Sequence, residues 1–220
     1  MKKILFRNIY KYCILLVFVL LTFACKKDED NDKPVSDLTP KNFDSYMDPR
    51  DSNVYKTIDI NGFIWFAENF RYECKDSWNY LNDTNIAKVY GRLYTQKAAL
   101  DAAPPGWHLP TRAEWDTLAE YLGGWEAAGG RLKEYGTSHW RNKNVEGSNS
   151  SGFTALPGGE RDPNGNFYYL GDMGNYWSAT LVQIDNFKAY HYELSGNSSY
   201  IIERFTEKNL GYSVRYVKNK

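Results

Sequence analysis

Residues 90–115 read Tyr-Gly-Arg-Leu-Tyr-Thr-Gln-Lys-Ala-Ala-Leu-Asp-Ala-Ala-Pro-Pro-Gly-Trp-His-Leu-Pro-Thr-Arg-Ala-Glu-Trp, and this stretch decides the fold. Thr95 can cap a short helix that continues through Leu100. The run Pro104-Pro105-Gly106 must end that helix, because proline lacks a backbone donor and restricts the residue before it. The stretch therefore predicts a short helix, a hard stop and a new segment beginning at Trp107.

A second helix is predicted after His108 and Leu109. Thr111 and Glu114 form a capping box, in which each side chain bonds a free backbone N–H group at the helix start. Apolar residues then recur at i, i+3, i+4 and i+7, namely Trp115, Leu118, Ala119 and Leu122. The pattern predicts a helix over residues 112–122 with one buried face, ended by Gly123-Gly124.

Strands are predicted on both sides of these helices. Alternating apolar residues over 54–60, the turn signal Asn61-Gly62 and the run 63–66 indicate a β-hairpin with a type I′ turn. Further aromatic-rich segments predict strands at 167–170, 176–180, 188–194, 200–205 and 212–217. Helices in the middle with strands on both sides indicate the α+β class.

The first 24 residues have the pattern of a secretory signal. Four basic residues precede an apolar run over 14–24, which is shorter than the roughly 18 residues that span a membrane. The segment ends Leu-Thr-Phe-Ala-Cys25, which resembles a bacterial lipobox, where the cysteine is acylated and becomes the mature N-terminus. The alternative is an ordinary signal peptide followed by a chance cysteine.

The residues after Cys25 favour the lipoprotein interpretation. Lys27, Asp28 and Glu29 resemble the export signal of Bacteroidota surface lipoproteins. We therefore expect a surface-exposed outer-membrane lipoprotein, held in the lipid by acylated Cys25. Residues 25–50 are polar and proline-containing, which predicts a disordered tether, so the domain is expected to occupy residues 51–220.

The charge balance excludes a nucleic-acid partner. Residues 1–24 hold four basic and no acidic residues, so the remaining 196 residues carry 23 basic and 27 acidic ones, a formal charge near −4. Proteins that bind nucleic acid concentrate lysine and arginine on one face. A mildly acidic chain of this length is expected to form one domain after its tether.

Seven motifs in sequence order resemble one family, the Fibrobacter succinogenes major paralogous domain, known mostly from surface lipoproteins. They are Asn53-Val-Tyr-Lys-Thr-Ile58, Trp65-Phe-Ala-Glu-Asn69, Tyr90-Gly-Arg-Leu-Tyr94, Pro104-Pro-Gly-Trp-His-Leu-Pro-Thr111, Gly152-Phe-Thr-Ala-Leu-Pro-Gly-Gly159, Tyr176-Trp-Ser178 and Gly211-Tyr-Ser-Val-Arg215. The residues expected to be structural are Trp107, Leu109, Pro110, Thr111, Glu114, Trp115, Pro157, Gly158 and Gly159. The resemblance covers roughly residues 51–218.

The chain is also similar to formylglycine-generating enzymes and their C-type-lectin-like relatives. This resemblance implies a C-type-lectin-like fold, a twisted antiparallel sheet of short strands with two helices and with the N- and C-terminal strands at one edge. It also implies a ligand site in irregular loops, here between residues 137 and 194.

Departures from the family bear on catalysis. Family members commonly have a cysteine where this chain has Ala103 and another where it has Tyr216, as expected if the two pair with each other. Losing such a bond removes about 2–5 kcal/mol, so packing must compensate. Formylglycine-generating enzymes need copper-binding cysteines, whereas only Cys74 remains beyond the signal and the lipobox. We therefore expect no enzymatic activity and no cofactor.

Cys74 and the three histidines, His108, His139 and His191, show no catalytic or metal-ligand spacing. Cys74 is interpreted as a buried small residue, with a reactive thiol as the alternative. His108 is expected to make a structural hydrogen bond. The segment 162–166 resembles the start of a calcium loop, but lacks the glycine and the acid that complete one, and is better interpreted as a hairpin turn. We expect no metal site.

Aromatic residues make up 16% of the chain and suggest a platform for sugar rings. The candidates are Trp140, Tyr168, Tyr169, Tyr176, Trp177, Tyr190 and Tyr192. The alternative is that these rings fill the core or form cross-strand pairs.

The leading hypothesis is a non-catalytic binding or adhesion module for a glycan or a surface protein. The alternatives are a structural envelope component and, last, an enzyme.

Overall fold

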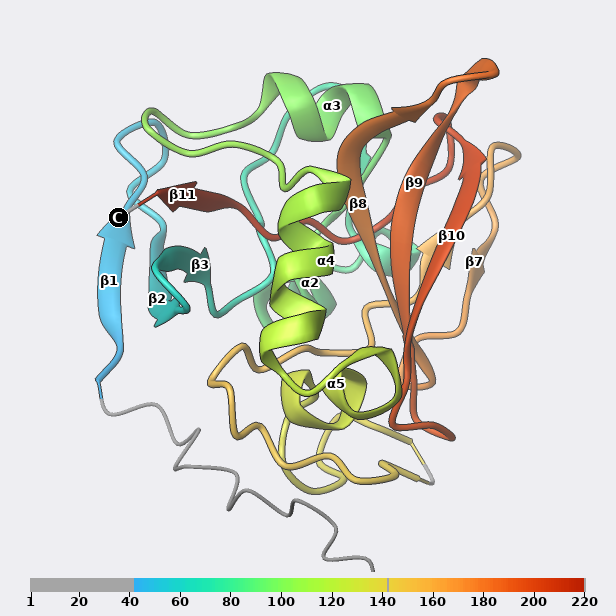
Figure 1. Ribbon diagram of the computed structural model, residues 1–220. Helices are drawn as coiled ribbons and strands as arrows, with labels where there is room; N and C mark the ends of the chain where they lie inside the picture. The colour runs from blue at the N-terminus through green and yellow to red at the C-terminus, as the bar shows by residue number, and fades with distance from the viewer. Residues whose placement is uncertain (1–41, 142, 220) are drawn as a thin grey trace, which may run out of the picture. The chain divides into compact units, whose positions relative to one another are not determined.

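The computed structural model describes residues 42–141 and 143–219 (Figure 1). The helices in these residues are α2 (Thr84–Tyr90), α3 (Gln96–Asp101), α4 (Arg112–Tyr121) and α5 (Trp125–Leu132), with the 3-10 turn η1 (Tyr80–Asn82). The strands are β1 (Asp44–Met47), β2 (Val54–Ile60), β3 (Phe63–Phe66), β4 (Ser77–Trp78), β5 (Leu93–Tyr94), β6 (Glu160–Arg161), β7 (Phe167–Tyr168), β8 (Met173–Val182), β9 (Asp185–Ser195), β10 (Ile201–Glu207) and β11 (Val217–Asn219). This mixture of helices and small antiparallel sheets is compatible with the α+β prediction. The signal, Cys25, the export signal and most of the tether lie outside the described residues.

The first sheet has the strand order β1-β2-β3-β11. The predicted hairpin β2–β3 is confirmed, with Asn61 at φ 53° and Gly62 at φ 82°, the positive values that a type I′ turn requires. Val217 of β11 pairs with Trp65 of β3, so the C-terminal strand lies beside the N-terminal hairpin.

Strand β1 corrects the expected start of the domain at residue 51. It pairs with β2 along its whole length, from Asp44 opposite Thr57 to Met47 opposite Val54. The following turn is also held in place, because the fully buried carboxylate of Asp48 accepts bonds of 2.9 and 2.6 Å from Arg50. Arg50 also donates to the carbonyl of Ala102. The segment is thus ordered although its sequence is polar, because Arg50 neutralises the buried charge of Asp48.

The second sheet has the order β10-β9-β8, and α4 and α5 pack beside it (Figure 1). Strands β8 and β9 form one hairpin that extends beyond the predicted strands 176–180 and 188–194. The predicted strand over 212–217 is wrong as a continuous strand. That segment makes isolated bridges, Tyr94 with Tyr212 and Tyr176 with Ser213, before β11 begins.

The two predicted helices are confirmed as α3 and α4. The hydroxyl of Thr95 accepts from the Ala98 amide at 3.1 Å, and Thr111 with Glu114 forms the capping box. His108 contributes a structural bond, with Nε2 2.7 Å from the Glu114 carboxylate. Ordinary capping chemistry thus fixes both helix starts.

Helices α2 and α5 were not predicted. Helix α5 contains Gly129 and Gly130, which lower intrinsic helix propensity. The structure explains Gly129, because a Cβ there would lie 2.3 Å from the backbone oxygen of Tyr200. Close approach of α5 to the segment before β10 therefore demands glycine.

Two hydrophobic clusters fill the interior. The first joins α4 and α5 to the second sheet through Trp115, Leu118, Leu132, Tyr192 and Leu194. The second surrounds Trp107, whose ring lies edge-on to Phe66 with 4.4 Å between centroids. The motif residues Trp107, Leu109 and Trp115 are buried in these two clusters.

The Pro157-Gly158-Gly159 motif forms a tight connection between the two halves of the chain. Pro157 accepts a backbone bond from Gly171, and Gly159 forms a bridge with Gly174 of β8. Gly159 has φ 70°, and a Cβ there would lie 2.4 Å from the oxygen of Tyr168. Glycine is therefore required at this position.

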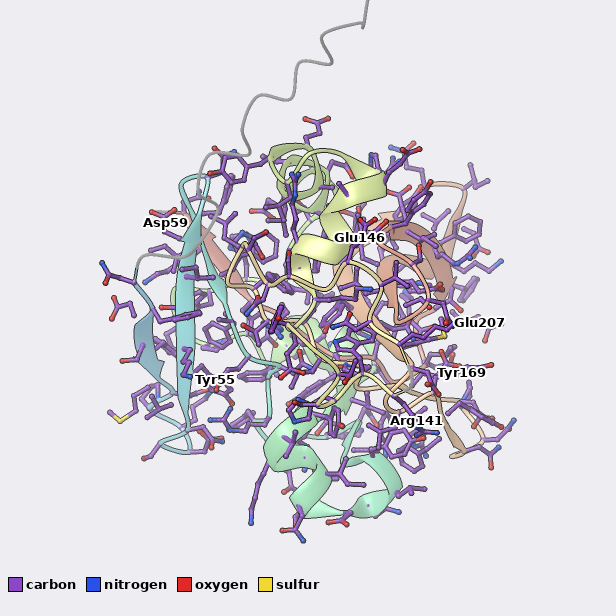
Figure 2. All side chains as sticks on the ribbon, turned by 90° about the horizontal axis from the view of Figure 1, so that it is seen from below. Tyr55, Asp59, Arg141, Glu146, Tyr169 and Glu207 are labelled. Atoms are coloured by element: carbon purple, nitrogen blue, oxygen red, sulfur yellow. The ribbon has the colours of Figure 1, made fainter. Side chains whose placement is uncertain are left out.

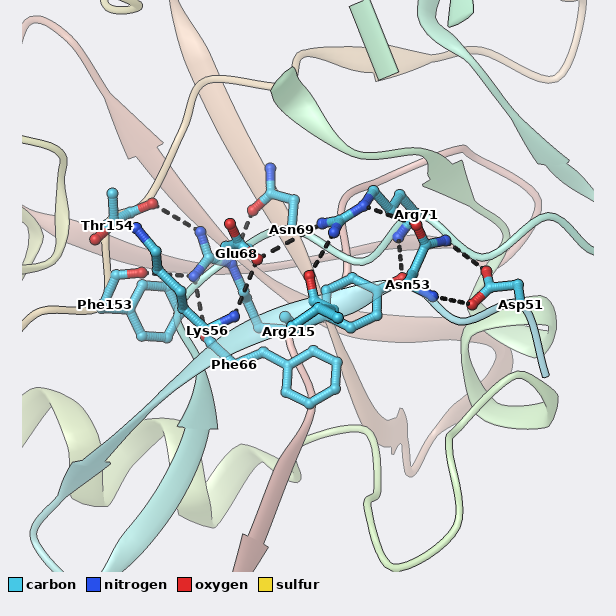
Figure 3. A network of polar contacts seen from close by, with 12 residues as sticks. Asp51, Asn53, Lys56, Phe66, Glu68, Asn69, Arg71, Phe153, Thr154 and Arg215 are labelled. Carbon is cyan, nitrogen blue, oxygen red and sulfur yellow. Dashed lines mark hydrogen bonds and ion pairs between the residues drawn. The ribbon is translucent and has the colours of Figure 1, made fainter. Parts of the chain in front are cut away.

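Arg215 joins three of the seven motifs in the interior (Figure 3). Its fully buried guanidinium donates to the side-chain oxygen of Asn69 and to the backbone oxygens of Phe66, Phe153 and Thr154, at 2.5–2.9 Å. Burial lowers the pKa of Arg215 to about 10. All four of these acceptors are neutral oxygens, and the Glu68 carboxylate adds electrostatic attraction to the guanidinium.

Tyr216 places a large side chain at the position where the family resemblance implies a cysteine. Its ring is fully buried against Phe66 and Phe70, at centroid distances of 5.9 and 4.7 Å. Its hydroxyl donates to the carbonyl of Ala99 at 2.7 Å, and Ala103 packs against the same cluster. Packing and one hydrogen bond therefore link β11 to α3, where the family pattern implies a disulfide.

Candidate functional site

The most exposed apolar surface of the described residues lies at the end of the β8–β9 hairpin. Ile184 at its tip is 97% exposed and Phe187 is 77% exposed. Exposed apolar residues that gather in one place mark interaction sites more often than residues scattered singly. The hairpin is therefore the first place to look for a ligand surface.

The register of the second sheet explains why this surface is uncovered. Directly opposite residues share a face, so Tyr190 pairs with Phe205, and Tyr192 with Glu203, on the face that α4 covers. Tyr192 lies under Trp115 of α4, with 4.8 Å between the rings. Helix α4 begins at Arg112, and the strands continue past its N-terminus. Tyr190 and Phe205 consequently have no helix above them.

A groove follows this uncovered part of the face, and we call it the hairpin groove. It has a volume of about 440 Å³ and is lined by Arg112, Thr180, Leu181, Val182, Gln183, Ile184, Asp185, Lys188, Tyr190 and Phe205. The rings of Tyr190 and Phe205 are 6.3 Å apart and nearly perpendicular. The guanidinium of Arg112 lies 4.8 Å from the centre of the Tyr190 ring, within the range of a cation–π contact.

Arg112 is fixed in place at one end of the groove. It forms a two-point ion pair with Glu203, at 2.6 and 2.9 Å, and its backbone N–H donates to the hydroxyl of Thr180. Two-point pairing restricts the guanidinium more than a single contact does. The guanidinium of Arg112 thus forms a rigid wall at this end of the hairpin groove.

A second groove lies on the other side of the Arg112–Glu203 pair, and we call it the acidic groove. Its volume is about 560 Å³, and its walls are Arg112, Asp116, Glu120, Trp125, Tyr200, Ile201, Ile202 and Glu203. Because Arg112 lines both grooves, the two grooves adjoin at this residue.

Four of the seven aromatic candidates are corrected by the structure. Trp140, Tyr176, Trp177 and Tyr192 are fully buried. Their polar atoms bond inside the protein, for example Trp177 Nε1 to the Tyr94 carbonyl at 2.7 Å and Tyr176 Oη to the Leu156 carbonyl at 2.8 Å. Rings without exposed faces cannot stack on a ligand, so these residues belong to the core.

The other three candidates do not form one platform. Tyr190 lines the hairpin groove, whereas Tyr168 and Tyr169 do not. Those two are half-exposed neighbours at the end of β7, and Tyr169 lies on the same side of the domain as Arg141, which bonds the carbonyl of Leu170 (Figure 2).

Sequence reasoning missed Arg112, Leu181, Ile184 and Phe205. Residues 181–187 lie between two predicted strands, so the sequence pattern places their apolar side chains in no element. The apolar residues Leu181, Ile184 and Phe187 in that short segment were the available signal, because a connecting loop is usually polar.

Cys74 is partly buried and packs against the second cluster. Burial raises the pKa of its thiol, and Ser77 and Arg92 offset this only in part. A thiol with a raised pKa is a weak nucleophile at neutral pH.

The segment 162–166 is a hairpin turn between β6 and β7, as expected. Asp162 accepts from both the backbone and the side chain of Asn166, which lowers the pKa of Asp162. Across residues 42–141 and 143–219, no three histidine, cysteine or acidic side chains come together as a metal site would require. The helices in the same residues are also too short or too polar to span a bilayer.

His191 lies on the opposite face of β9, against Trp177 and Tyr212. It is buried, its Nδ1 has no hydrogen-bond partner, and burial together with Arg204 lowers its pKa to about 4 from 6.5. The folded protein therefore keeps His191 neutral at pH values where an unfolded chain would protonate it.

Acidification should consequently destabilise the fold through His191. Between pH 6.5 and 4 the unfolded state binds the extra proton, so stability falls as pH falls, by about 3 kcal/mol at the lower end. The measurement is the free energy of unfolding of the wild type and His191→Phe at pH 7 and pH 4. The variant should lose correspondingly less stability, and equal losses would show that His191 does not contribute.

Comparison with known proteins identifies one family. The model of the Fibrobacter succinogenes major domain matches residues 58–218, which include both grooves and Arg215. No curated protein matches the chain, and no solved structure does.

Proposed function

The chain belongs to the Fibrobacter succinogenes major domain family, and we propose that it is a non-catalytic binding or adhesion module that recognises its partner through the hairpin groove. The observation that carries the proposal is the exposed apolar end of the hairpin, with Ile184 97% exposed beside a groove floored by Tyr190 and Phe205. Such a surface exposes apolar area that a partner would remove from water.

A protein partner fits this groove better than a glycan. Aliphatic side chains such as Leu181 and Ile184 provide apolar contact but no flat ring for a sugar, and the two aromatic rings stand nearly perpendicular. A protein segment can fill such a groove with apolar side chains, with Arg112 as a polar contact at its edge.

We place this module in a C-type-lectin-like fold. The pairing of β3 with β11 supports this assignment, because it joins the N-terminal and C-terminal strands in one sheet. Two helices, α4 and α5, pack beside the second sheet. A solved structure of this chain that superimposes poorly on C-type-lectin-like domains would overturn the assignment.

The proposed location is the cell surface, with acylated Cys25 in the outer membrane. The lipobox-like sequence and the acidic residues after it support this placement. Replacing Cys25 with alanine should move the protein from the membrane fraction to the soluble fraction. Membrane retention of the variant at the wild-type level would contradict the lipid anchor.

The groove is tested with two variants of the full chain. Ile184→Ser with Phe205→Ser removes apolar surface from the hairpin groove, and Val54→Ser removes a half-exposed apolar side chain from β2, in the other sheet. The wild type and the Val54 variant should both bind a ligand, either on a glycan array or, when immobilised, among fractionated envelope proteins. The double variant should lose it at least tenfold, because each apolar side chain contributes about 1 kcal/mol or more. Equal retention by all three proteins, or retention by none, would overturn the proposal.

A further inference from the structure

Carboxylates and aromatic rings meet in the acidic groove, and the balance of charge there is negative. Asp116 and Glu120 of α4 and Glu203 of β10 face Arg112, the single basic residue that lines the groove. Arg112 is paired with Glu203. Asp116 and Glu120 therefore remain without an ion-pair partner in the described part of the chain.

Asp116 also shares its hydrogen-bond donor, the Tyr192 hydroxyl, with other oxygens. Tyr192 Oη lies 3.3 Å from Asp116 Oδ1, 3.2 Å from Glu203 Oε2 and 3.3 Å from the backbone oxygen of Arg112. A hydroxyl has one proton and can donate to one of these three oxygens at a time. Two carboxylates thus compete for a single donor.

Burial, followed by repulsion from Glu203, raises the pKa of Asp116. A cation in the groove would favour the charged form of Asp116 and offset the repulsion.

Two aromatic rings line the groove beside these charges, together with Ile201 and Ile202. Tyr200 is 46% exposed, and Trp125 is partly buried, with its ring stacked 6.0 Å from Tyr192. Aromatic faces attract ammonium and guanidinium groups, and more strongly when the cation is partly desolvated. Across residues 42–141 and 143–219 no three acidic, histidine or cysteine side chains are grouped as a metal site requires, whereas the aromatic rings of this groove suit an organic cation.

We infer that the acidic groove binds the lysine or arginine side chain of a protein partner, between the carboxylates of Asp116 and Glu120 and the rings of Trp125 and Tyr200. The inference rests on the proposed function, because the same partner would continue into the hairpin groove across the Arg112–Glu203 pair. The partner is thereby specified as a segment that carries an apolar part and, next to it, a basic residue.

The test uses small probes and the purified full chain in detergent. The protein is labelled with 5-fluorotryptophan, and the Trp125 resonance is assigned from a Trp125→Phe sample. The probes are Nα-acetyl-lysine methylamide and Nα-acetyl-arginine methylamide, with the uncharged Nα-acetyl-norleucine methylamide and calcium chloride as comparisons. The cationic probes should shift the Trp125 resonance in a saturable way, whereas the norleucine probe and calcium should not.

Two double variants distinguish binding of the probes in the acidic groove from general attraction to the negative charge of the protein. Asp116→Asn with Glu120→Gln should weaken binding of the cationic probes about tenfold, since an ion pair together with a cation–π contact is of that order. Asp44→Asn with Asp101→Asn removes two exposed charges elsewhere and should leave the affinity unchanged. A norleucine or calcium response equal to that of lysine, or equal affinity in the Asp116/Glu120 variant, would overturn the inference.

The outcome of the probe experiment does not depend on the hairpin groove. The probes do not require Ile184 or Phe205, so cation binding can fail while the partner assay succeeds, and the reverse can also occur.

Discussion

Replacing Arg215 with methionine should lower the free energy of unfolding by about 3–5 kcal/mol. The change leaves four oxygens without their donor: the side-chain oxygen of Asn69 and three backbone oxygens, of which only that of Thr154 is part-buried. Each buried acceptor without a partner costs about 1–3 kcal/mol. The folded state regains about 3 kcal/mol because it no longer buries a charge whose pKa is lowered to about 10. The loss of four bonds exceeds that gain.

Denaturant unfolding of purified variants measures this effect. Arg215→Lys should fall between the wild type and Arg215→Met, because an ammonium group has three donors on a compact head and cannot reach all four oxygens. Arg204→Met is the matched control. Arg204 is exposed and pairs with Glu193 at the surface, so this change should cost less than about 1 kcal/mol. Equal stability of the Arg215 and Arg204 methionine variants would mean that the buried network contributes nothing.

Replacing Tyr216 with alanine should cost about 3–5 kcal/mol, as large-to-small changes of buried aromatic residues do. The ring contacts Phe66 and Phe70 in the second cluster, and its hydroxyl bonds the Ala99 carbonyl of α3. A cavity there would separate β11 from α3, at the place where the family pattern implies a disulfide.

Tyr216→Phe distinguishes packing from hydrogen bonding. This variant keeps the ring and removes one hydrogen bond, so it should cost about 1 kcal/mol. If Tyr216→Ala cost no more than Tyr216→Phe in denaturant unfolding, the ring would not be the compensation for the absent cysteine pair.

The sequence could predict the elements of the fold that are fixed by interactions between residues close together in the chain. The capping residues Thr95, Thr111 and Glu114 and the turn Asn61-Gly62 act over three or four residues, so their chemistry is visible in the chain itself. Strand β1 and helix α5 depend on distant partners. The Asp48 carboxylate accepts from Arg50, which also donates to the Ala102 carbonyl, and α5 depends on the approach of Tyr200 to Gly129.

The site could not be predicted because burial is decided by packing between elements. Tyr190 and Tyr192 have the same residue type and lie on the same face of β9. Tyr192 is buried because α4 covers it, and Tyr190 lines a groove because α4 begins at Arg112. Alternation along a strand separates two faces, but it does not show how far a helix extends over one of them.

Site-specific photo-crosslinking on intact cells tests the central claim most directly. A benzophenone amino acid is placed at Ile184, or at Val54 as the control, in the full chain. If the hairpin groove is the binding surface, irradiation should join position 184 to one defined partner and leave position 54 unreacted. A crosslink of equal yield from position 54, or no crosslink from position 184, would contradict the account.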